Sequence, residues 1–93
     1  MVIGVLRIEV LIPGASSLKE KRMVLRSLKD RLRNNFNISV SEVDMHDKWQ
    51  RAVIAIAGVN KDKGYLNGQL DKVVDFIERF RGVEVSDYEM EIG

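Results

Sequence analysis

Few residues of this sequence could do chemistry, and most of them are cations. The chain has no cysteine, which excludes a thiol nucleophile, a thiolate metal site and an iron–sulfur cluster. Ser16 and Ser17 have no histidine or lysine in a nucleophile arrangement, and the sequence contains no Walker or GxGxxG phosphate loop. We therefore expect a non-enzymatic protein with no catalytic residues and no cofactor.

Metal-ligand residue types come close together only at Asp44, His46 and Asp47. Oxygen and nitrogen ligands at this spacing could hold a divalent ion. The sequence places no further ligand beside them, and so we favour an exposed polar turn. We expect no metal site.

A concentration of positive charge between residues 16 and 36 is the strongest functional signal. The segment holds seven cations against Glu20 and Asp30, although the whole chain has a net charge of only +1. In a helix five of these cations would form one stripe, rising ~5 Å per turn, that can follow a phosphate backbone. The basic stripe consists of Lys19, Arg22, Arg26, Lys29 and Arg33.

A solvated helix face that keeps the protein soluble is the simpler interpretation of this charge. Such faces usually mix signs at i,i+4, whereas here only Asp30 lies close by. Lys21 falls outside the stripe, on the leucine side between Leu18 and Leu25. Its stem could pack while its ammonium reaches water, or the ammonium could bind an anion. We include Lys21 among the candidate nucleic-acid ligands.

Alternating and helical hydrophobic patterns predict six elements that position these residues. The elements are a strand at 2–12, a helix at 18–34, a strand starting at Ile38, a strand at 51–59, a helix from near Gly64 to Gly82 and a strand at 83–92. The order βαββαβ predicts a ferredoxin-like α+β fold, in which a four-stranded antiparallel sheet carries both helices on one face. We expect a single domain over residues 1–93.

Local signals refine these boundaries. Ser17 to Glu20 reads as a capping box, in which Glu20 reaches back to the Ser17 amide. Asn60 or Asp62 can cap the second helix. A slip in the alternation predicts a bulge near Ser41 and Glu42.

The sheet face without helices is expected to be small and apolar, built from Ile3, Val5, Val53, Ala55 and Ala57. Its central strands carry no aromatic residue, which disfavours the base stacking used by RNA-recognition sheets. A second copy of the chain is the simplest cover, and so we expect a homo-oligomer through this face. Trp49, the only tryptophan, is expected to fill the core at the base of the hairpin, with an exposed recognition platform as the alternative.

The apolar N-terminal run is interrupted by Arg7 and Glu9, and no basic segment precedes it. It therefore predicts neither a signal peptide nor a membrane span. We expect a cytoplasmic protein with no membrane partner.

Three segments, SLKEKR (17–22), FNISVSEVD (36–44) and DKWQRA (47–52), together resemble the YlxP-like family, a small bacterial family of unknown function. The resemblance covers nearly the whole chain and implies a ferredoxin-like fold but no catalytic residue. Genes of the family often lie beside those of translation initiation and ribosome maturation factors, which implies a role near RNA or the ribosome. The matched positions to test are Lys19, Lys21, Arg22, Glu42, Asp47, Trp49 and Gln50.

Charge and resemblance together favour a non-enzymatic RNA- or ribosome-associated protein that binds phosphates through the basic stripe. One alternative is a small-molecule-sensing regulatory module with a site at the turn from Pro13 to Ser17. Another is an assembly module that acts through its sheet face.

Overall fold

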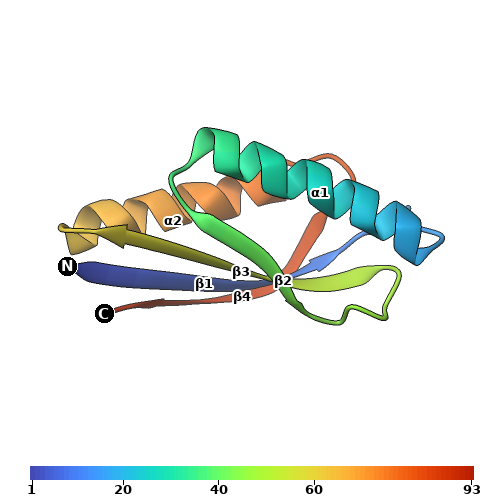
Figure 1. Cartoon of the computed structure of the whole chain (residues 1–93), viewed down its shortest axis with the longest axis horizontal. Helices are drawn as coiled ribbons and strands as arrows, with labels where there is room; N and C mark the ends of the chain where they lie inside the picture. The colour runs from blue at the N-terminus through green and yellow to red at the C-terminus, as the bar shows by residue number, and fades with distance from the viewer.

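A four-stranded antiparallel sheet is covered on one face by two helices (Figure 1). The computed structural model describes all 93 residues. Strands β2 and β3 form a hairpin, β1 lies between β3 and β4, and the strand order is β2-β3-β1-β4. The elements are β1 (Val2–Leu11), α1 (Leu18–Asn35), β2 (Ser39–Asp44), β3 (Arg51–Asn60), α2 (Lys63–Glu78) and β4 (Glu84–Ile92). The predicted element order and the ferredoxin-like α+β fold are confirmed.

The hydrophobic core lies between the sheet and the helices. Because successive side chains of a strand point to opposite faces, Leu6, Ile8 and Val10 of β1 all point toward the helices and are buried. Leucines of α1 and α2 cover them at helical spacing. The buried helix residues include Leu25, Leu28, Leu32, Leu66, Leu70, Val73 and Ile77. Neither helix is long and apolar enough to cross a membrane.

The N-terminus of α1 is capped largely as the sequence predicts. The Ser17 hydroxyl accepts a hydrogen bond from the Glu20 amide at 3.1 Å. The Glu20 carboxylate was expected to accept from the Ser17 amide. It accepts instead from the hydroxyl and the amide of Ser16, at 2.6 and 3.1 Å. The Ser16 hydroxyl, and then its amide, hold the pKa of the Glu20 carboxyl below its usual range. The reciprocal half of the capping box is thus displaced by one residue.

Asp62 caps α2, which settles the choice between Asn60 and Asp62. Its carboxylate accepts from the amides of Gly64 and Tyr65 at 2.9 and 3.3 Å. Asn60 supports the cap by accepting from the Asp62 amide.

The predicted bulge in β2 is present, slightly later than expected. The pairing register with β3 shifts between Glu42 and Asp44, which leaves Val43 as the extra residue. Directly afterwards Met45 adopts a left-handed φ of 61°, and no other non-glycine residue has a positive φ. This bend turns the chain into the β2–β3 connection.

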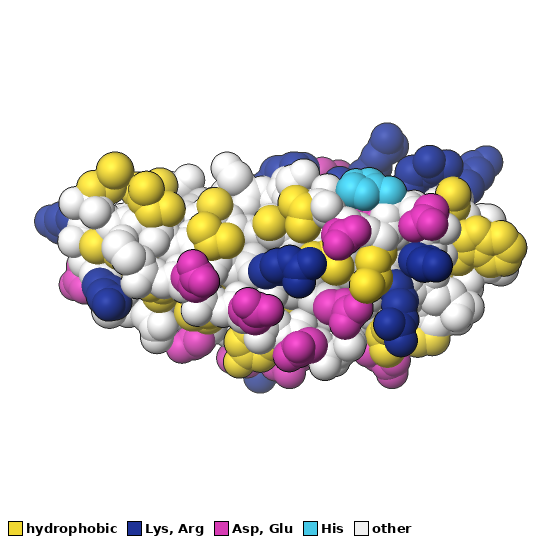
Figure 2. All heavy atoms as spheres, turned by 90° about the horizontal axis from the view of Figure 1, so that it is seen from below, with side chains coloured by type: hydrophobic (Ala, Val, Ile, Leu, Met, Phe, Trp, Pro, Cys, Tyr) yellow, Lys and Arg dark blue, Asp and Glu magenta, His cyan; other side chains and the backbone are white.

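The open face of the sheet is not the uniformly apolar surface that the sequence predicts. Figure 2 shows hydrophobic side chains at both ends of the view and, between them, further hydrophobic side chains interspersed with acidic and basic ones. Val53 is only 1% exposed, whereas Ile3, Val5 and Val59 remain exposed. The charges follow from strand register, because pairing brings polar residues of four strands onto this face. Among them are two ion pairs, Arg7–Asp44 at 3.7 Å and Arg51–Glu9 at 3.9 Å.

Two paired glycines allow α2 to approach the sheet closely. Gly4 of β1 lies directly opposite Gly58 of β3. A Cβ atom at Gly4 would lie 2.9 Å from Leu70 Cδ1, and one at Gly58 would lie 3.0 Å from Leu66 Cδ1. Larger residues at either position would push these leucines of α2 away from the sheet.

We predict that Gly4→Ala lowers the free energy of unfolding by about 1–3 kcal/mol, because the added methyl overpacks the contact with Leu70. The control is Gly68→Ala in α2, where an added methyl meets no atom within 4 Å. Alanine there should instead stabilise the protein by about 1 kcal/mol through its helix propensity. Urea denaturation measures both changes, and equal midpoints for the two variants would contradict the close-approach interpretation.

Candidate nucleic-acid interface

The basic stripe lies on the flank of α1 that faces the edge strand β2. Lys19, Arg22 and Arg26 are exposed on this flank, and Lys29 is half-buried. A hollow of about 370 Å³ runs between α1 and β2. It is lined by four of the five stripe residues, Arg22, Arg26, Lys29 and Arg33, together with Leu25, Asp30 and Glu42.

Most of the positive charge of the stripe has no acidic partner. No carboxylate lies within 4.0 Å of the charged groups of Lys19, Arg22, Arg26 or Lys29. Arg33 is the exception, since its guanidinium lies 3.6 Å from Asp30. It also donates to the Val40 carbonyl at 3.0 Å, which holds it against β2. The remaining four cations are free to meet an anion.

The acidic C-terminal strand does not neutralise the stripe. Its carboxylates belong to β4, whereas the stripe lies beside β2 at the opposite edge of the sheet. Three strand spacings of ~4.8 Å separate these edges, a distance larger than the Debye length of about 8 Å at physiological ionic strength. The molecule therefore has one basic edge and one acidic edge.

Lys21 is not part of this exposed surface, and its prediction as a nucleic-acid ligand is wrong. Its side chain is 1% exposed, and its ammonium donates to Glu42 Oε2 at 3.1 Å. The backbone carbonyls of Met45 and Arg51 accept from the same ammonium at 2.9 and 3.2 Å. The His46 carbonyl lies at 3.4 Å as a fourth acceptor, so the acceptors around the ammonium already outnumber its three protons. Neither water nor a phosphate can therefore bind Lys21 in this arrangement.

Gln50 joins the end of the β2–β3 connection to the turn before α1. Its Nε2 donates to the carbonyls of Pro13 and Ala15 at 3.2 and 3.1 Å. Lys21 and Gln50 thus fasten the start of α1 and the turn before it to the β2–β3 connection. We call Lys21, Glu42 and Gln50, with the carbonyls they bind, the hydrogen-bonded clamp. Sequence reasoning selected all three residues as family-motif positions but did not predict that they hold the same two segments of the chain together.

The other motif positions of the connection are exposed. Trp49 is 55% exposed, and so the expectation that it fills the core is wrong. Asp47 is exposed as well. Asp44 accepts from the Met45 amide at 2.7 Å and pairs with Arg7, while a ring nitrogen of His46 lies 3.3 Å from the Glu42 carbonyl. The structure brings no three histidine or acidic side chains together in an arrangement that could hold a metal ion.

The protein is therefore a small ferredoxin-like α+β protein. Its basic helix α1 lies at one edge of the sheet and is hydrogen-bonded to the β2–β3 connection through Lys21. The family described as "Protein of unknown function (DUF503)" matches residues 3–90, and the chain belongs to this family. The "Uncharacterized protein YlxP" of Bacillus subtilis (strain 168) is 40% identical over 82 residues, which cover 88% of this chain and 89% of that protein. The YlxP-like resemblance is thereby confirmed, and the function of the family is not established.

We predict that Lys21→Met lowers the free energy of unfolding by about 3 kcal/mol, because it leaves the Glu42 carboxylate without its cation and two carbonyls without a donor. Lys19→Met is the matched control, since Lys19 is exposed on the same helix and lacks an ion-pair partner. Its effect should stay within about 0.5 kcal/mol. Chemical denaturation measures both, and a Lys21→Met variant as stable as the control would rule out a structural role for the clamp.

Proposed function

We propose that this protein is a non-enzymatic RNA-binding protein that docks on RNA phosphates through the basic stripe of α1. The observation that carries the proposal is the row of exposed stripe cations without a carboxylate within 4.0 Å. Charge placed in this way costs stability through self-repulsion, which an anionic partner would relieve.

The spacing of the stripe supports a polyanion rather than a single anion. The four unpaired cations, Lys19, Arg22, Arg26 and Lys29, are three or four residues apart, so they rise by about one turn, ~5.4 Å, from each to the next. A row of this kind meets successive phosphates of a backbone, and each contact releases condensed counterions. Arginine also binds phosphate oxygens in a bidentate manner, which favours a phosphate over a diffuse acidic surface.

We further propose that the RNA bound by the stripe is ribosomal RNA. The family resemblance implies a role near RNA or the ribosome, and the abundant cytoplasmic single-stranded and helical segments of ribosomal RNA suit a backbone-reading helix. We propose a cytoplasmic site of action on a ribosomal subunit or its precursor.

We predict that the combined variant Arg22→Glu, Arg26→Glu and Lys29→Glu abolishes binding to a fluorescently labelled RNA, measured by anisotropy. For the unchanged protein, log Kd should rise with log salt by about 0.7 per single-strand phosphate contacted, and by about 0.9 per duplex phosphate. Co-sedimentation with ribosomal subunits at low salt, and its loss at high salt, should follow the same pattern.

Lys48→Glu, Lys61→Glu and Lys63→Glu together form the matched control, because these exposed lysines lie outside the stripe and their reversal changes the net charge equally. This control should retain most of the affinity. If both triple variants bind RNA alike, the attraction depends on overall charge and the stripe is not the binding surface.

Self-association is a second candidate function, favoured by the apolar end of the open face. Ile3, Val5 and Val59 are 49%, 43% and 56% exposed and adjoin one another through the β1–β3 pairing. A contiguous exposed apolar group of this kind favours a second copy as its cover. The small-molecule alternative has less support, because Gln50 already occupies the carbonyls of Pro13 and Ala15 in the turn where a ligand was expected.

For this second candidate, Val5→Lys should convert an oligomer into a monomer, since it places a charge in the middle of the apolar end. Light scattering of the purified chain measures the mass directly. Ser41→Lys is the control, because Ser41 is exposed on β2 outside the apolar end. A chain that is already monomeric, or a Val5→Lys variant that keeps the oligomer, would refute association through this end.

A further inference from the structure

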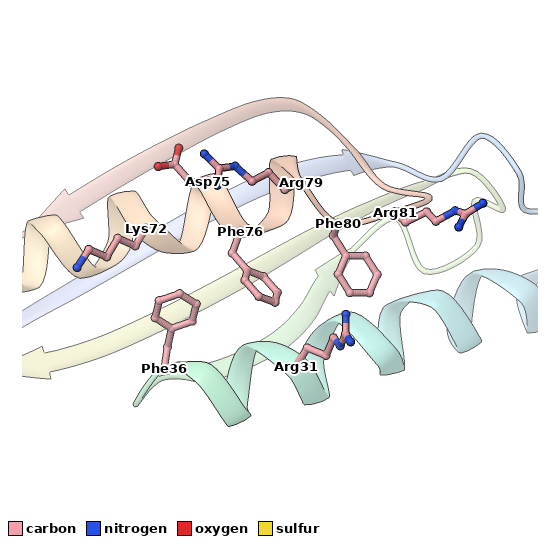
Figure 3. Close-up of a pocket in the computed structure, with 8 residues that line it drawn as sticks. All are labelled: Arg31, Phe36, Lys72, Asp75, Phe76, Arg79, Phe80 and Arg81. Atoms are coloured by element: carbon pink, nitrogen blue, oxygen red, sulfur yellow. The ribbon is translucent and has the colours of Figure 1, made fainter.

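A groove of about 560 Å³ lies between the two helices, separate from the basic stripe. It lies where the C-terminal half of α1 faces the C-terminal half of α2 (Figure 3). Three aromatic residues, four cations and one carboxylate line it: Phe36, Phe76, Phe80, Arg31, Lys72, Arg79, Arg81 and Asp75. The proposed function does not use this groove.

Aromatic rings form the floor of the groove. Figure 3 shows Phe76 of α2 and Phe80, just after α2, pointing toward α1, with Phe36 pointing back from the end of α1. The centroids of Phe36 and Phe76 are 5.9 Å apart with perpendicular ring planes, and those of Phe76 and Phe80 are 6.4 Å apart. All three rings are only half-buried, although they pack against the core. Aromatic surface is therefore left open to a ligand.

Cations stand around these rings. Arg31 points from α1 toward Phe80, and Lys72 lies at the other end of the groove (Figure 3). Neither has a carboxylate within 4.0 Å, nor do Arg79 and Arg81. Asp75 and Arg79 are drawn on the side of α2 away from α1. Arg31 thus places positive charge beside the ring of Phe80, whereas Lys72 and Arg81 extend outward at the two ends of the groove.

This combination selects a ligand that is both flat and anionic. A purely apolar ligand would leave the cations unused, and a simple anion would gain nothing from the rings. Grooves that combine cations with stacking aromatics are the means by which proteins hold unpaired nucleobases. The volume also falls within the range of about 300–1,000 Å³ that is usual for small-ligand sites.

We propose that this groove binds an unpaired nucleotide, its base against the phenylalanine rings and its phosphate near Arg31 or Lys72. The inference rests on the proposed function and deepens it, because the stripe and Arg31 lie on opposite flanks of one helix. The stripe faces β2, whereas Arg31 faces α2. A single-stranded RNA held by the stripe and crossing α1 would place an unpaired base in the groove. Duplex RNA could not do so, because its bases are paired.

The test compares single-stranded with duplex RNA of equal length for the variant Phe80→Leu, which keeps an apolar side chain but removes the ring. Affinity for the single strand should fall about tenfold, as expected for one lost stacking contact, while affinity for the duplex stays unchanged. Tyr88→Leu is the control, since Tyr88 is an exposed aromatic on β4 outside the groove. It should alter neither affinity.

A second variant keeps the test valid if Phe80→Leu does not fold, as urea denaturation would reveal. Arg31→Gln changes only an exposed cation of the groove and should weaken single-strand binding without affecting duplex binding. Adenosine and uridine monophosphates, titrated while the ring protons of the three phenylalanines are followed by NMR, separate a free nucleotide from a strand as the source of the base.

The outcomes distinguish this inference from the proposed function. If the groove variants bind single-stranded RNA normally while the stripe variant does not, the groove proposal is overturned and the stripe proposal stands. If monophosphates shift the phenylalanine signals but no RNA binds, the groove is a nucleotide site and the stripe proposal fails. If the unchanged protein binds neither RNA nor monophosphate, both are overturned.

Discussion

The buried ammonium of Lys21 is the constraint on which the arrangement of the first helix depends. Removing a charge from water is costly, and the cost is tolerable only when the charge is paired and its hydrogen bonds are complete. Here Glu42 supplies the opposite charge, and the Met45 and Arg51 carbonyls supply the other acceptors. No buried polar side-chain atom is left without a partner. Because these acceptors come from β2, β3 and their connection, the helix has only one satisfactory position over the sheet edge.

That fixed position decides which side of α1 faces outward. Lys21 shares the inner face with Leu25, Leu28 and Leu32, and the exposed stripe residues Arg22 and Arg26 lie off that face. The clamp also depends on the irregular end of β2, where the bulge and the left-handed φ of Met45 turn the chain so that its carbonyl meets the ammonium. The outward charge of the stripe and the inward charge of Lys21 are thus consequences of a single helix orientation.

The regular part of this structure could be predicted because its signals are local. Alternation placed the strands, the leucine spacing placed α1, and Ser17 marked its start. Sequence alone could not pair Lys21 with Glu42, because the partner is 21 residues away and the other acceptors are backbone carbonyls that carry no sequence signal. Trp49 was misplaced for a related reason, since its exposure depends on the path of the β2–β3 connection.

Contacts between elements that are far apart in the sequence could not be predicted either. Alternation within β1 alone places Arg7 on the same face as Ile3 and Val5, but only the pairing of the strands sets Arg7 beside Asp44. The helical groove needs Phe36 of α1 to meet Phe76 of α2, 40 positions apart in the chain. Each partner, taken alone, reads as an ordinary member of a hydrophobic stripe.

The separation of positive and negative charge on the molecule would orient it relative to an approaching polyanion. The carboxylates of β4 lie at one edge of the sheet and the uncompensated cations of α1 at the other, with the central strands between them. Such a field attracts a negatively charged strand to the helix edge and repels it from the acidic edge before any contact forms. The central strands of the sheet carry no aromatic residue on which a base could stack, and the exposed aromatic of the sheet is Tyr88 of the acidic strand β4. Electrostatic steering and aromatic surface both favour the helical side, and this coincidence is the physical reason to seek an RNA ligand there.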